Sequence, residues 1–158
     1  MKNLKGYTKR LFILLLYFWA AFSIDIVSAV SERNVEKSEG LHIIVNVNNT
    51  IDSVTVNQLS RIFNKKSKKF ENGMASLPIA QKSNSSVTEI FNRKILNKNA
   101  KQLKYYWARK MFSGSNKPPK SLASDMEVVR FVASVENAVG YVSKIPKNKN
   151  VKVIRIEP

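Results

Sequence analysis

The chain has 158 residues, and its 27 Lys or Arg against 11 Asp or Glu give a formal net charge of +16 at pH 7. It contains no cysteine, which excludes disulfides, thiolate catalysis and Cys-ligated zinc. The single histidine, His42, has no acidic neighbour in the sequence, and the aspartates fit no metal-binding spacing. We therefore expect a non-enzymatic protein without a metal or cofactor.

The first 29 residues have the parts of a secretory signal peptide. A basic head precedes an apolar run from Leu11 to Phe22, and Val27 to Ala29 supply a small-residue processing site. An uncleaved membrane anchor is the alternative, but Asp25 within the span would cost about 2.5–3.5 kcal/mol. Both interpretations place the rest of the chain outside the cytoplasm, so we expect a periplasmic or secreted protein that does not meet nucleic acid and touches a membrane only through an uncleaved leader.

One domain is expected after the leader. Residues 30–40 are polar and lack periodicity, which predicts a flexible lead-in, and residues 41–158 have the usual length of a single domain. Without the leader's four basic residues and one acidic residue, residues 30–158 carry a net charge of +13. This charge favours a partner that is itself acidic, such as a phosphate-like solute or an acidic protein.

Predicted strands and helices alternate along the domain. Apolar alternation and apolar runs predict strands at residues 41–47, 77–80, 138–142 and 151–156. Helical spacing predicts helices after Thr55, after Ser86, over residues 100–112 and after Ser124. Polar, basic or Pro-containing stretches predict exposed loops at residues 64–73 and 113–121. This order predicts an α/β fold with helices packed on a mostly parallel or mixed sheet.

Three of the helices share a capping signal, a hydroxyl residue followed three positions later by Glu or Gln. The pairs are Thr55 with Gln58, Ser86 with Glu89 and Ser124 with Glu127. The helix over 100–112 instead aligns apolar residues at spacings of three and four. This spacing predicts that Trp107 belongs to the core and that the basic side chains of the helix face solvent.

A polar junction lies between the strand at 77–80 and the helix that follows it. Its residues are Gln81, Lys82, Ser83, Asn84, Ser85 and Ser86. A strand that leads into a helix brings free N–H groups and the positive end of the helix dipole to one point, which suits an oxyanion. The alternative is that Ser86 only caps the helix and its neighbours are solvated.

Several segments occur in an order typical of one protein family. They are LHIIVNVNN (41–49), FNRKIL (91–96), LKYYWARKMFSG (103–114), SDMEVVRFV (124–132) and NAVGYV (137–142). Together they resemble the short phosphate ABC transporter substrate-binding-protein-like family of periplasmic binding proteins. The resemblance covers residues 41–142 and implies one periplasmic-binding-protein-like lobe, a mixed sheet with helices packed on it, and a phosphate-like anion as ligand.

The polar junction is where the chain departs from this family. Phosphate-binding members place Arg, three residues, and then Ser-Gly-Thr before the helix. Aligned on Phe91, Gln81 stands in the place of the arginine, Ser86 in that of the glycine and Val87 in that of the threonine, while Ser85 keeps its type. Lys82 then offers charge beside the junction, although an amide at position 81 lacks the bidentate charged contact of arginine.

Two functions follow from the resemblance. The first is an exported binding protein for phosphate or a similar oxyanion, with a second copy or another envelope protein completing the half-open site. The second is an envelope interaction or scaffold protein that keeps the lobe, has lost the ligand, and meets an acidic partner with its basic surface.

Overall fold

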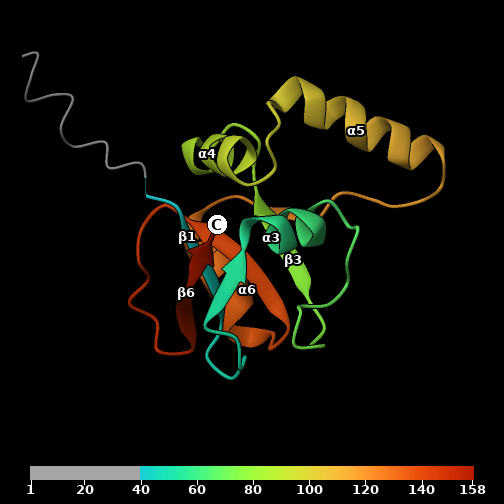
Figure 1. The fold of residues 1–158 in the computed structure, drawn as a ribbon. Coiled ribbons are helices and arrows are strands. Elements are labelled where there is room, and N and C mark those ends of the chain that lie inside the picture. Colours follow the sequence, from blue (N-terminus) through green and yellow to red (C-terminus); the bar gives the residue numbers. More distant parts are fainter. Residues whose placement is uncertain (1–39) are drawn as a thin grey trace, which may run out of the picture. The chain divides into compact units, whose positions relative to one another are not determined.

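The structure is a computed structural model that describes residues 40–158 (Figure 1). The predicted signal peptide and residues 30–39 of the predicted lead-in lie outside the described residues. The described elements are β1 (His42–Asn46), β2 (Ser53–Thr55), α3 (Val56–Phe63), β3 (Leu77–Gln81), α4 (Ser86–Lys94), α5 (Ala100–Phe112), β4 (Lys120–Leu122), α6 (Asp125–Ser134), β5 (Ala138–Val142) and β6 (Val151–Glu157). None of these helices is both long enough and apolar enough to cross a bilayer.

The six strands form one mixed sheet in the order β2-β6-β1-β5-β3-β4. β1 lies at its centre and pairs antiparallel with β5 and β6, whereas β3 pairs parallel with β5 and β4. The antiparallel pairing puts the carboxyl end of β1 at the opposite end of the sheet from the carboxyl end of β3. The predicted mixed α/β sheet with packed helices is therefore confirmed.

The period-2 alternation of the strands divides the core between the two faces of the sheet. Ile43 and Val45 of β1 belong to the cluster that α3 and α4 cover, and Ile44 between them belongs to the cluster that α6 covers. All three side chains are fully buried. Both faces of the central strand are thus covered, which explains the almost unbroken apolar run in the sequence.

The packing of α6 on the sheet depends on a glycine. A Cβ atom at Gly140 in β5 would lie 2.6 Å from Cγ1 of Val128 and 3.4 Å from Cγ2 of Val132, both on α6. The first separation is too short for any real contact, so only glycine allows the helix to approach β5 this closely.

Most helix starts agree with the sequence. Thr55 caps α3 by accepting from the N–H of Gln58, and Ser124 caps α6 by accepting from the N–H of Glu127. The prediction that Ser86 caps α4 is wrong, because Ser85 takes the extended capping conformation and Ser86 is the first helical residue. The sequence reading also missed the short β2 and the capping box of Asn99 and Gln102 at the start of α5, which uses an amide in place of a hydroxyl.

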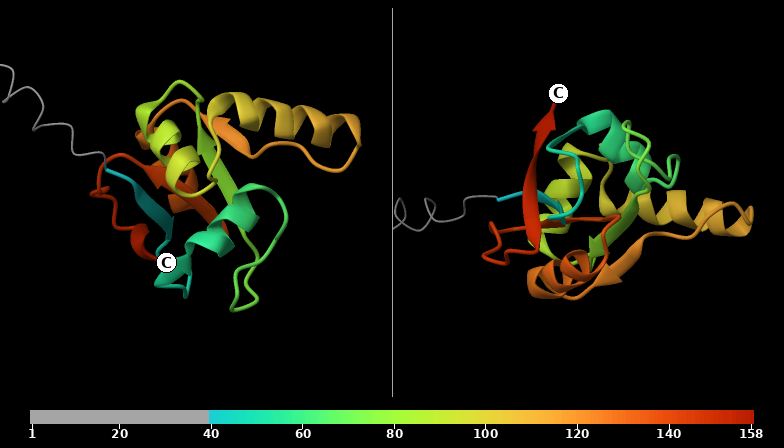
Figure 2. Two further views of the ribbon diagram at one scale, coloured as in Figure 1. Left: turned by 45° about the horizontal axis from the view of Figure 1, so that its top comes forward. Right: turned by 90° about the horizontal axis from the view of Figure 1, so that it is seen from below.

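The bounds of α5 are as predicted, but its place in the fold is not. None of its residues is buried, so the prediction that Trp107 belongs to the core is wrong. Figure 1 and both views of Figure 2 show α5 (yellow to orange) reaching out past the sheet before the chain returns to β4. The predicted loop at 113–121 accordingly ends in β4, which pairs with β3 at the edge of the sheet.

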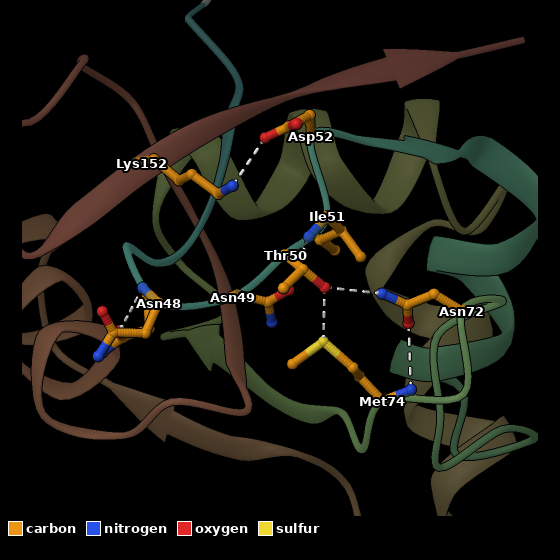
Figure 3. A network of polar contacts seen from close by, with 9 residues as sticks. Asn48, Asn49, Thr50, Ile51, Asp52, Asn72, Met74 and Lys152 are labelled. Atoms are coloured by element: carbon orange, nitrogen blue, oxygen red, sulfur yellow. Dashed lines mark hydrogen bonds and ion pairs between the residues drawn. The ribbon is translucent and has the colours of Figure 1, made fainter.

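One end of the sheet is closed by hydrogen bonds among its own loops. Asn46, at the end of β1, donates from Nδ2 to the carbonyl oxygens of Val132 (2.9 Å) and Ala133 (3.0 Å) in α6. Figure 3 shows the neighbouring contacts, in which Thr50 Oγ1 donates to Met74 Sδ and accepts from Asn72 Nδ2. Because the polar groups that leave β1 are largely paired within the chain, we call this region the closed end.

Candidate functional site: the open end of the sheet

The opposite end of the sheet, where β3 and β5 finish, holds the predicted polar junction. Its first residue, Gln81, is 5% exposed, and groups of the chain itself accept from its main-chain N–H and from its side-chain Nε2. Gln81 Nε2 donates to Asp125 Oδ1 (2.6 Å) and to the carbonyl oxygen of Tyr141 (3.1 Å), while its N–H donates to Tyr141 Oη (3.1 Å). Gln81 therefore fastens β3 to β5 and α6, and its amide is not directed to solvent.

The partners of Gln81 are also satisfied. Asp125 Oδ2 accepts from the N–H (2.9 Å) and the Oγ (2.6 Å) of Ser143. The Tyr141 hydroxyl lies 3.0 Å from Thr88 Oγ1, and burial raises the pKa of Tyr141 above its usual value of 10.0. The phenol is therefore neutral at physiological pH. Its hydroxyl group holds the junction in place through hydrogen bonds and does not act as an acid or base.

Beyond Gln81 the junction forms a tight turn. The N–H of Lys82 donates to the carbonyl of Leu122 (3.0 Å), and the N–H of Ser85 donates back to the carbonyl of Lys82 (3.1 Å). Ser85 Oγ accepts from the N–H of Thr88 (3.3 Å) and donates to Thr88 Oγ1 (2.8 Å). These two bonds explain why Ser85 rather than Ser86 caps α4: Thr88 offers partners to the Ser85 hydroxyl, whereas Glu89 is exposed.

Ser83 and Asn84, at the tip of the turn, are exposed. Within residues 40–158 their side chains have no hydrogen-bond partner. The N–H groups of Ser86 and Val87 open α4, where helical geometry supplies no carbonyl acceptor. The turn thus combines unpaired polar side chains with free main-chain donors.

A polar hollow of about 750 Å³ lies beside the turn. Ser83, Asn84 and Ser85 line one side, and the other side comes from the last turn of α4 and the start of α5. The charged residues that line it are Glu89, Arg93, Lys98 and Lys101. The hollow therefore carries more positive than negative charge, and it borders the N-terminal, positive end of α5 and both ends of α4.

The structure splits the six predicted site residues. Ser83, Asn84 and Ser85 lie together in the polar hollow, Gln81 faces the interior, and Lys82 and Ser86 do not line the hollow. The sequence reading missed Arg93, Lys98 and Lys101 as neighbours of the turn. No local motif marks them, because α4 and the following loop have to fold before they approach it.

On its other side, the turn borders a mainly apolar groove of about 520 Å³ beneath α5. Leu103 and Trp107 of α5 face Phe91, Leu96 and the ring of Tyr141 across this groove. We call this hollow, bounded by α5, the end of α4 and the segment before β4, the α5 groove.

Most of the residues that line the two hollows come from one stretch of chain whose charges are all positive. From Ile90 to Ser124 the sequence contains no Asp or Glu. The same stretch, the basic segment, contains Arg93, Lys94, Lys98, Lys101, Lys104, Arg109, Lys110, Lys117 and Lys120. Within the described residues, no group of three or more His, Asp or Glu side chains is placed to hold a metal ion.

Comparisons with known proteins agree on the fold. No protein-family model matches the chain, and no curated protein matches it in sequence. A solved phosphate ABC transporter substrate-binding protein from Clostridium perfringens, with bound phosphate, is similar at a TM-score of 0.58 and 17% identity, over 74% of this chain and 44% of that one. A phosphate transport receptor from Vibrio cholerae gives 0.57 and 18%, over 74% and 46%.

PstS from Borrelia burgdorferi is similar at a TM-score of 0.56 and 15% identity, over 75% of this chain and 47% of that one. The chain therefore spans less than half the length of each of these solved proteins. At such identities the likeness concerns the fold alone. The open-ended α/β lobe described above has the PstS-like fold of phosphate ABC transporter substrate-binding proteins.

Proposed function

We propose that the protein is an exported, non-enzymatic binding protein for phosphate or a similar oxyanion. The anion is held in the polar hollow beside the turn, by the side chains of Ser83 and Asn84 and the positive charge of the basic residues that line the hollow. The observation that carries this proposal is the polar hollow, where two unpaired polar side chains stand beside Arg93, Lys98 and Lys101. The fold shared with a solved protein that holds phosphate supports it.

The geometry also sets the strength of binding. Ser83, Asn84 and Lys101 are exposed, and exposed charge pairs each contribute about 0–1 kcal/mol. Gln81, which replaces the arginine of phosphate-binding relatives, is engaged by Asp125 and Tyr141 and adds no charge. A few such contacts correspond to a Kd on the order of 1 mM. Salt weakens this binding, because mobile ions screen exposed charges.

The test is calorimetric titration of phosphate and sulfate into the purified protein at low and at physiological salt. Replacing both Ser83 and Asn84 with Ala is expected to weaken phosphate binding about tenfold, which corresponds to about 1.4 kcal/mol. Lys101→Gln removes one charge at the hollow and should weaken binding about twofold to fivefold.

Lys149→Gln is the matched control, because it removes the same charge from an exposed loop near the closed end. It should leave phosphate binding unchanged. Equal losses from Lys101→Gln and Lys149→Gln would mean that net charge alone attracts the anion. The absence of heat from both anions at low salt would contradict the proposal outright.

A second candidate function rests on a different observation. Gln81 is buried and has all its donors consumed within the chain, and the chain spans less than half the length of the solved protein with bound phosphate that it resembles. Both facts favour an interaction protein that keeps the lobe and uses its basic surface to meet an acidic partner. Loss of phosphate binding with retention of a protein partner would identify this role.

A further inference from the structure

The α5 groove is a mainly apolar hollow that the described fold covers only in part, since Leu103 packs against the core and Trp107 is half-buried. None of the residues of α5 is buried, although Leu103 and Trp107 line a groove of about 520 Å³ opposite Phe91. Beyond the groove, Met111 is 53% exposed and Phe112 is 94% exposed. Apolar surface of this extent beside a concave groove is typical of a binding surface rather than of a solvated helix.

The rim of the groove is basic. Lys104 of α5 lines it directly. The whole basic segment, residues 90–124, carries positive charge without a single Asp or Glu. An occupant that places apolar side chains in the groove must therefore bring negative charge to its rim.

Charge and shape select among the occupants. A second copy would bring its own basic segment against this one, and like charges at an interface cost several kcal/mol. A bilayer is broad and flat, so it cannot fill a concave groove between a helix and the end of a sheet, although it could meet Phe112. A polypeptide with bulky apolar side chains flanked by carboxylates fits both the groove and its rim.

We infer that the α5 groove docks an acidic segment of a partner protein, which inserts apolar side chains beside Leu103 and Trp107 and sets Asp or Glu against Lys104 and the rest of the basic segment. This inference rests on the interaction role, the second candidate function, and makes that role specific by naming the surface and the chemistry of the partner. It does not depend on anion binding in the polar hollow.

A labelled synthetic peptide tests the inference with the full protein. The probe carries Leu or Phe at positions i, i+3, i+4 and i+7 and Glu elsewhere, with a fluorescein label, and binding is followed by anisotropy at physiological salt. A glutamate-only peptide of the same length should bind at least about tenfold more weakly, because it lacks the side chains that fill the groove.

Two variants of α5 separate the groove from the rest of the helix. Leu103→Asp places a carboxylate in the groove and should weaken binding of the probe at least about tenfold. Tyr105→Asp makes the same charge change about 200° around the helix, on a side chain that is 64% exposed, and should weaken binding less than about threefold. Circular dichroism checks folding, and Lys104→Glu tests the rim if Leu103→Asp disturbs the helix.

Several outcomes would overturn the inference. Equal binding of the two peptides, or equal losses from Leu103→Asp and Tyr105→Asp, would show that the protein attracts acidic peptides through its positive charge alone and that the groove plays no part. A dimer in sedimentation that Leu103→Asp dissolves would assign the groove to a second copy. Binding to phosphatidylglycerol vesicles but not to the probe, with loss in Phe112→Ser, would assign α5 to a membrane surface.

The two proposals fail separately. Leu103→Asp should leave the heat of phosphate binding unchanged, because Leu103 does not line the polar hollow. Asn84→Ala, at a residue that lines the polar hollow but not the α5 groove, should in turn leave binding of the probe within about twofold.

Discussion

Within the described residues, polar side chains of the same kinds are hydrogen-bonded at one end of the sheet and left without partners at the other. At the closed end, Asn46, Asn49, Thr50 and Asn72 satisfy main-chain and side-chain groups of neighbouring loops. At the open end, Ser83 and Asn84 have no partner within residues 40–158. The contrast is one of degree, because Asn49 Nδ2 at the closed end is buried without a partner in the described part of the chain, whereas the unpaired side chains of the turn at the open end are exposed and available to a ligand.

The largest expected effect is a difference in stability between a variant of the core and a variant of α5. Phe91 is buried and stacks on Tyr141 with ring centroids 4.1 Å apart. Phe91→Ala should lower the free energy of unfolding by about 3–5 kcal/mol, measured by urea denaturation. Trp107→Ala removes a larger ring from α5 and should cost less than about 1 kcal/mol, because that side chain is not buried. A Trp107→Ala cost as large as that of Phe91→Ala would break the comparison and place α5 in the core.

A smaller difference in stability is expected between alanine variants of two asparagines, one at each end of the sheet. Asn46→Ala leaves the last carbonyls of α6 without their buried donor and should cost about 1–3 kcal/mol in unfolding free energy. Asn84→Ala, at the open end, should change stability by less than about 0.5 kcal/mol in the same urea experiment. A destabilising Asn84→Ala would show that the turn holds the fold together, which would remove the distinction between the two ends.

The smallest effect concerns pH at the closed end. The hydrogen bond and charge of Lys152, 2.7 Å away, lower the pKa of Asp52 below its usual value of 3.8. A carboxyl with a lowered folded-state pKa stabilises the fold fully above 3.8, and this contribution disappears as the pH falls through the folded-state pKa. Thermal denaturation should therefore show a small advantage of the native protein over Asp52→Asn at neutral pH, which shrinks in acid and in high salt. An advantage that persists in acid would assign it to something other than the ion pair.

Local signals in the sequence predicted the helices, four of the six strands and the mixed sheet. Alternation in residues 41–47 and the caps at Thr55 and Ser124 depend on near neighbours, which sequence alone displays. The error at Trp107 has a different cause. Helical spacing shows that Leu103 and Trp107 share a face, but it cannot show whether the chain supplies anything to cover that face.

The candidate site divides in the same way. Position after a strand and before a helix was sufficient to select Ser83, Asn84 and Ser85. The engagement of Gln81 by Asp125 and Tyr141, 44 and 60 positions away, depends on how β5 and α6 pack beside β3. The same holds for the approach of Lys98 and Lys101 to the turn, because a fold has to exist before distant charges converge on one hollow.

The uncovered face of α5 also has a consequence for how the sequence can change. α5 contributes no buried residue, so apart from Leu103, which packs against the core, and Tyr106, whose hydroxyl donates to the Asn64 carbonyl, folding places little restriction on its side chains. The sequence of α5 would then be constrained by the partner that docks there, whereas Gly140 and the central strands are constrained by core packing. The two parts of one small chain could in this way diverge at different rates, with α5 adapting to a new counterpart on an unaltered scaffold.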